Sequence, residues 1–91
     1  MAVYLVSYDL RNPGRNYAPL WARLVDWKAQ RALESLWLMD TAASAVTIRD
    51  DLKQYIDLND RILITKLAGE TAWTTLQAGA SEWLHAHFPT T

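Results

Sequence analysis

The strongest candidate for chemistry in this sequence is Asp9, a carboxylate that ends the apolar run of residues 3–8. The run is rich in valine, tyrosine and leucine, which favours a strand and places Asp9 at the rim of a sheet. A hard cation such as Mg²⁺ takes oxygen ligands and keeps several waters, so one or two carboxylates hold it. A symmetric dimer that brought two copies of Asp9 together would supply the pair. The alternative is a turn residue that accepts hydrogen bonds from the backbone N–H groups after it.

Two arginines, Arg11 and Arg15, flank Asn-Pro-Gly directly after this carboxylate. Guanidinium groups bind phosphates, and so do the N–H groups of a loop near a helix N-terminus. Further along, Ser35 lies in an apolar stretch, where its hydroxyl could hydrogen-bond a phosphate or position a water. The alternatives are solvated arginines in the loop and, for Ser35, a polar strand residue that faces solvent or a neighbouring backbone.

Other polar and aromatic residues are better explained by structure. On a helix, His85 and His87 point to different faces, so they do not share a ligand geometry. No Gly-x-Ser-x-Gly motif is present, and this argues against a Ser-His-Asp hydrolase. The five tryptophans could stack on unpaired bases, but their positions on apolar faces favour the core. We expect Asp50 and Asp51 to begin a helix, where acids interact favourably with its dipole.

Length and composition predict one small domain, residues 1–91, with half of the residues apolar and no cysteine. Thiolate metal sites and disulfides are therefore excluded. The sequence has no leader pattern and no apolar run long enough to span a membrane, so we expect a cytoplasmic protein. Net charge is −1, but residues 1–31 carry five basic and two acidic side chains. This asymmetry is a weak indication of an anionic partner, and solvated helix faces explain it equally simply.

Hydrophobic periodicity predicts an alternation of strands and helices. Residues 41–45 turn the chain and are the place for a short additional strand, and residues 71–76 suit an edge strand or a helical turn. The predicted elements are, in chain order, a strand over 3–9, a helix from Asn16 to about Ala29, a strand over 31–39, a helix from about Ser44 to Ile56, a strand over 61–67 and a short helix over 81–88, which packs Trp83, Leu84 and Phe88.

With the short additional strand counted before the second helix, this order is the split βαβ pattern, in which right-handed crossovers place both helices on one face of an antiparallel sheet. The expected fold is therefore an α+β, ferredoxin-like sandwich with a short C-terminal helix. Strands this apolar do not leave the other face of the sheet in water, so a second copy of the chain is expected to cover it. The C-terminal helix is a competing cover.

The stretch YLVSYDL, followed by a helix and then by Arg31, Ser35 and Trp37 on a strand, resembles the small CRISPR-associated adaptation nucleases. These are the second Cas protein and its stand-alone or VapD-type toxin relatives. The resemblance covers roughly residues 3–67 and implies antiviral defence, a ferredoxin-like fold and a homodimer formed through the sheets. It also implies that Asp9 binds Mg²⁺ (or Mn²⁺) across the dimer interface.

Three functions remain open. In the first, a homodimer is a metal-dependent endonuclease for RNA or DNA. Its catalytic residues are Asp9, Arg31 and Ser35, its metal ligand is Asp9, and Arg11, Arg15 and Arg31 bind nucleic acid. In the second, a non-catalytic dimer binds duplex nucleic acid or a partner protein, such as an integrase. In the third, a toxin or regulator acts on a target other than nucleic acid.

Overall fold

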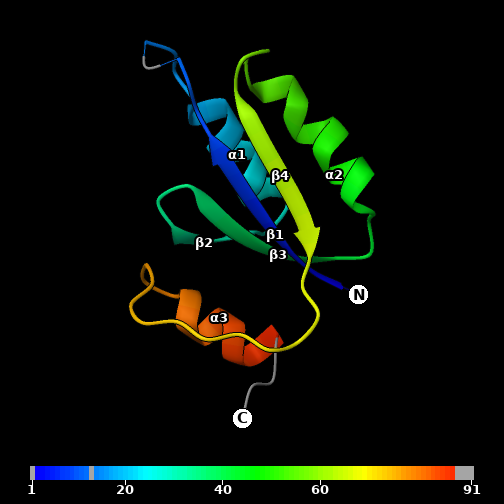
Figure 1. The fold of residues 1–91 in the computed structure, drawn as a ribbon, viewed down its shortest axis with the longest axis vertical. Helices are drawn as coiled ribbons and strands as arrows, with labels where there is room; N and C mark the ends of the chain where they lie inside the picture. Colours follow the sequence, from blue (N-terminus) through cyan, green and yellow to red (C-terminus); the bar gives the residue numbers. More distant parts are fainter. Residues whose placement is uncertain (1, 13, 88–91) are drawn as a thin grey trace.

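The computed structural model describes residues 2–12 and 14–87, and Figure 1 shows its arrangement. Its elements are, in chain order, β1 (Ala2–Asp9), α1 (Ala18–Asp26), β2 (Gln30–Leu33), β3 (Leu36–Thr41), α2 (Ala45–Leu52), the 3₁₀ turn η1 (Lys53–Tyr55), β4 (Arg61–Lys66) and α3 (Ala80–His87).

The strands form one antiparallel sheet in the order β2-β3-β1-β4. The longest strand, β1, lies inside the sheet, where Val6 is opposite Trp37 of β3 and Ile64 of β4. This order, with a helix after β1 and another after β3, is the ferredoxin-like arrangement. The predicted α+β sandwich with an antiparallel sheet and a C-terminal helix is therefore confirmed.

The helix α1 forms because its apolar residues recur at helical spacing, and Leu20 and Leu24 are fully buried. At its start, the side chain of Asn16 accepts a hydrogen bond from the N–H of Ala18 at 3.0 Å. The helix ends at Asp26, three residues before the predicted end. Lys28 has a φ of +61°, and the N–H of Ala29 closes the terminus by donating to the carbonyl of Leu24.

The predicted strand over residues 31–39 is wrong in one respect, because it is a hairpin made of β2 and β3. A turn at Glu34 and Ser35 reverses the chain, and Leu33 and Leu36 face each other across it. The run after this turn reads as continuously apolar because β3 packs on both of its faces. Its side chains at Trp37 and Met39 are buried under the helices, and those at Leu36 and Leu38 pack on the opposite face.

The main core lies between the sheet and the pair of helices α1 and α2. Alternate residues of β1 point into it, since a strand directs successive side chains to opposite faces. Ser44 caps α2 by accepting a hydrogen bond from the N–H of Thr47 at 3.1 Å, which confirms the predicted start of that helix. The largest fully buried side chains are Val6, Leu20, Leu24, Met39, Ile48 and Leu52.

The C-terminal segment covers part of the other face of the sheet, and Figure 1 shows α3 apart from α1 and α2, near β2. Leu84 of α3 packs in a second cluster with Ala32 and Leu38. The N–H of Gln77 donates to the carbonyl of Ala32 at 3.0 Å, so this segment also pairs with the edge of β2. The tail helix, predicted as one possible cover, is therefore the cover of the β2–β3 half of this face.

Side chains of the tail pack on one another. His87 stacks on Trp83 with ring centroids 4.0 Å apart, and His85 meets Trp73 edge-on at 5.3 Å. Phe88, which was predicted to pack with this helix, lies outside the described residues. Among the helices in the described part of the chain, none is long and apolar enough to cross a membrane.

Candidate functional site

A recess of about 340 Å³ lies where β1 ends beside the turn between β2 and β3. Three residues selected from the sequence, Asp9, Arg31 and Ser35, line it together. They meet because the N–H of Tyr8 donates to the carbonyl of Ser35 at 3.1 Å, which joins the end of β1 to the turn. The remaining lining residues are Tyr8, Leu10, Trp21 and Glu34.

The carboxylate of Asp9 is 60% exposed and lies between two guanidinium groups. Its Oδ2 is 3.5 Å from Nη1 of Arg11 and 3.7 Å from Nη1 of Arg61, its partner across the sheet. Within residues 2–12 and 14–87, the carboxylate of Asp9 therefore contacts two arginines. Within these ranges it does not accept the backbone N–H hydrogen bonds that the alternative role as a turn residue predicted. The two arginines make the surroundings of Asp9 positive and suited to an anion.

The guanidinium of Arg31 lies over two aromatic rings and is held by hydrogen bonds. The carbon atom at the centre of its guanidinium is 5.3 Å from the ring centroid of Trp21 and 5.4 Å from that of Trp37. Its Nε donates to the carbonyl oxygen of Glu34 at 3.0 Å, and its Nη2 donates to the same oxygen. The guanidinium plane is thus oriented before any ligand arrives.

The hydroxyl of Tyr8 connects Trp21 and Trp37 by hydrogen bonds, a role that the sequence did not reveal. It accepts hydrogen bonds at 3.0 Å from the indole N–H groups of both Trp21 and Trp37. It also donates to the carbonyl of Glu34 at 3.4 Å. The predicted assignment of Trp21 and Trp37 to the apolar face is correct, and their polar edges share one acceptor.

Ser35 occupies a different local structure from the predicted one. It lies in the exposed turn of the hairpin, not on a strand, because the chain reverses at Glu34 and Ser35. The turn places Ser35 in the lining of the recess, whereas a strand position would have directed its side chain to one face of the sheet.

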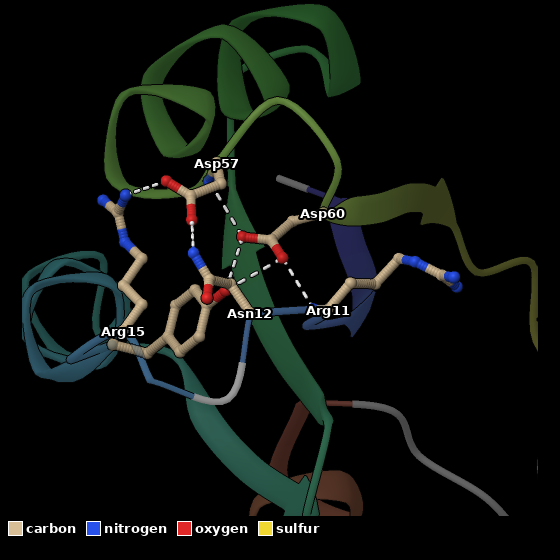
Figure 2. Close-up of polar contacts among 6 residues, drawn as sticks. Arg11, Asn12, Arg15, Asp57 and Asp60 are labelled. Atoms are coloured by element: carbon tan, nitrogen blue, oxygen red, sulfur yellow. Dashed lines mark hydrogen bonds and ion pairs between the residues drawn. The ribbon is translucent and has the colours of Figure 1, made fainter.

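The first loop (residues 10–12 and 14–17) is bound to the loop of residues 57–60, as Figure 2 shows. Arg15 forms an ion pair with Asp57, and the side-chain amide of Asn12 donates to the same carboxylate at 2.7 Å. The charge of Arg15, predicted to bind nucleic acid, is therefore already paired within the chain. Arg11 differs, because only its backbone N–H contacts this second loop.

Asp60 is the centre of the contact between the two loops (Figure 2). Its carboxylate accepts from the N–H of Arg11 at 2.7 Å, from the hydroxyl of Tyr17 at 2.8–2.9 Å and from the N–H of Asp57 at 2.8 Å. Burial raises the pKa of Asp60, but these hydrogen bonds outweigh it, so the pKa lies below its ordinary value. The sequence pattern indicated no role for residues 57–60, which lie between the predicted helix and strand, although two acids three positions apart in a loop were a usable signal.

Asp51 also has a role different from the predicted one. It lies near the end of α2, not at its start, and it accepts hydrogen bonds from Arg23 of α1 at 2.7 and 2.9 Å. The indole N–H of Trp27 donates to it at 2.7 Å. The hydrogen bonds from Arg23 lower the pKa of Asp51, although burial opposes them. Asp51 thus joins the two helices, and interaction with a helix N-terminus does not explain it.

The lowered pKa values of Asp51 and Asp60 predict that the protein loses stability in acid. Both have folded-state pKa values below the ordinary 3.8, so the unfolded chain binds protons first as the pH falls. Their contribution is complete above about pH 5 and is lost as the pH falls through the folded-state values. We expect the melting temperature to be constant from pH 6 to 8 and to fall steadily below about pH 4, measured by circular dichroism. The variant D51N should show a smaller fall, and an equal fall would contradict this assignment.

The predicted magnesium site is incomplete in one chain. A metal would find one carboxylate, Asp9, with two guanidinium groups within 4 Å. Among residues 2–12 and 14–87, no group of three or more acidic or histidine side chains could hold a metal. Asp9 of a single chain, with two guanidinium groups beside it, is therefore a poor ligand set for the ion, and the Asp9 of a second copy would complete a pair of carboxylates.

No family model matches this chain, and no solved structure matches it. The resemblance to the CRISPR-associated nucleases, drawn from short motifs, stays a prediction.

Proposed function

We propose that the protein is a homodimeric, metal-dependent endonuclease that hydrolyses phosphodiester bonds of RNA or DNA, similar to the CRISPR-associated adaptation nucleases. The observation that carries the proposal is the meeting of Asp9, Arg31 and Ser35 in one recess. Because Asp9 lies far in the sequence from Arg31 and Ser35, it is the fold that brings these residues together. The arginines on either side of Asp9 support a phosphate as the group that binds nearby.

The uncovered part of the sheet supports a homodimer. Leu63 of β4 is opposite Ser7 and is 61% exposed on the face that α3 covers only over β2 and β3. Asp9 follows Ser7 by two residues and so lies on the same face. A second copy that packed here about a two-fold axis would bury Leu63 and bring a second Asp9 towards the first.

In this dimer each group has a defined task. When bound, Mg²⁺ or Mn²⁺ would activate a water and neutralise phosphate charge. Asp9 of each copy would hold it, while Arg11 and Arg31 bind phosphate oxygens and the hydroxyl of Ser35 donates to one. The ion pair of Arg15 with Asp57 gives it a smaller part in binding than the sequence predicted. The lack of cysteine agrees with action in the cytoplasm.

A second candidate is a non-catalytic dimer that binds duplex nucleic acid or a partner protein, such as an integrase. The specific observation in its favour is the position of Asp9 between Arg11 and Arg61. There the carboxylate orients two cations, and the local charge is positive without a metal. This arrangement suits phosphate binding without hydrolysis.

The test is a cleavage and binding assay on the purified wild-type protein, with its oligomeric state measured by light scattering. Labelled single-stranded RNA and duplex DNA are incubated with Mg²⁺, Mn²⁺ or a chelator. The endonuclease proposal expects a dimer and cleavage that the chelator abolishes. Binding without cleavage, weakening steeply with salt, selects the second candidate. A monomer that neither binds nor cleaves nucleic acid excludes both.

A further inference from the structure

The recess beside Asp9 has an aromatic and planar wall that phosphate binding alone does not require. Trp21, which lines it, is half-buried, and the guanidinium of Arg31 lies over the rings of Trp21 and Trp37. The volume of about 340 Å³ is enough for one flat heterocycle and its sugar, and it cannot admit a base pair with its two backbones.

The guanidinium of Arg31 is oriented before binding. Two of its nitrogens donate to the carbonyl of Glu34, and that carbonyl also accepts from Tyr8. A guanidinium plane held over indole rings offers a flat surface for another π-system, and unpaired bases stack on aromatic rings and on arginine planes. Because the plane is already fixed, a base that stacks here loses little free energy to ordering of the side chain.

Polar groups at the mouth of the recess remain available. Within residues 2–12 and 14–87, no hydrogen bond is found for the hydroxyl of Ser35, for the carboxylate of Glu34 or for Nη1 of Arg31. The hydroxyl of Ser35 and Nη1 of Arg31 can donate to the edge of a base or to the phosphate next to it, and the carboxylate of Glu34 can accept from an amino group of a base. Arg11 and Arg61, beyond Asp9, lie where the backbone of the same strand would leave the recess.

We propose that this recess receives one unpaired nucleobase, stacked against Arg31 and Trp21, so that the ligand is single-stranded nucleic acid. This inference rests on the proposed function, because it names the substrate class of the same site. In this binding mode the recess holds the base, and the arginines around Asp9 hold the phosphates on either side of that base.

The experiment uses the whole protein with chelator present, at low salt of about 50 mM. A DNA strand containing the fluorescent base 2-aminopurine is compared with a blunt duplex of the same length. We expect the single strand to bind about tenfold tighter, and its fluorescence to change on binding, because the base exchanges stacking on its neighbours for stacking in the recess. The variant R31K keeps the charge and loses the plane, and it should lose most of the single-strand preference. R49K, an exposed arginine of α2 paired with its neighbour Asp50, is the matched control and should behave as wild type.

The outcomes separate this inference from the function on which it rests. Equal affinity for the single strand and the duplex, or binding with unchanged 2-aminopurine fluorescence, overturns the base recess and leaves nucleic-acid binding intact. No binding of either form overturns the proposed function together with the inference. Because R31K also loses hydrogen bonds to Glu34, its melting temperature is measured, and the wild-type fluorescence result decides the question if the variant is unstable.

Discussion

Replacing Asp9 by asparagine is expected to lower metal-dependent cleavage at least about 100-fold, since even residues that only support metal ligands cost 10- to 100-fold when changed. In the proposed dimer, the two copies of Asp9 hold the metal, so D9N removes the negative charge of both ligands. The fold should not change. The side chain is 60% exposed and its ion pairs are 3.5 and 3.7 Å long, so the free energy of unfolding should change by less than about 0.5 kcal/mol.

The measurement is the initial rate of cleavage with Mg²⁺, for D9N and wild type side by side, with each protein confirmed as the same oligomer. D50N is the matched control, because Asp50 is an exposed aspartate paired only with its neighbour Arg49 in the described part of the chain. The control should cleave as wild type does. Equal rates for D9N and wild type would show that Asp9 is not a metal ligand and that the cleaving site lies elsewhere.

Replacing Asp60 by alanine is expected to destabilise the protein by about 2–3 kcal/mol. The half-buried carboxylate accepts hydrogen bonds from two backbone N–H groups and from the hydroxyl of Tyr17, and truncation leaves these donors without their acceptor. The loss should be concentrated in the first loop. Since Arg11 is one of the donors, its side chain should also lose its position beside Asp9.

Urea unfolding measures the total change, and amide hydrogen exchange locates it. Exchange should accelerate at Arg11 and Asp57, whose N–H groups donate to Asp60, and should stay unchanged at Val6 in the centre of the sheet. D60N keeps an acceptor oxygen and should cost less than D60A, while D50A should cost less than about 0.5 kcal/mol. A D60A protein as stable as D50A would mean that the contact between the two loops contributes nothing.

The order of strands and helices could be predicted because local patterns agree with the fold. A composition rich in valine, tyrosine and leucine identified β1, and a strongly apolar run identified β4, each to within a residue, while apolar residues at helical spacing identified α1 and α2. These patterns persist because each element buries one face against the same core. From that order, the handedness of the crossovers was enough to predict the ferredoxin-like arrangement.

The hairpin of β2 and β3 could not be predicted in the same way. Its turn, at Glu34 and Ser35, has none of the glycine, asparagine or proline residues that mark hairpin turns. The reversal is stabilised instead by hydrogen bonds to the carbonyl of Glu34, one from Arg31 within the same hairpin and one from Tyr8 of β1. A turn held by tertiary contacts leaves no signal in its own residues.

By itself, the sequence determined the fold class, the elements other than the hairpin of β2 and β3, and the candidates Asp9, Arg31 and Ser35. Only the tertiary structure decided how these residues are surrounded. The ion pair of Arg15 with Asp57, the hydrogen bonds of Asp60 with Arg11 and Tyr17, and the link of Asp51 to Arg23 join residues 28 to 49 positions apart. Local periodicity records which face of an element is buried. It contains no information on which polar side chains meet once those faces pack, because that depends on loop paths and on the register of the whole sheet.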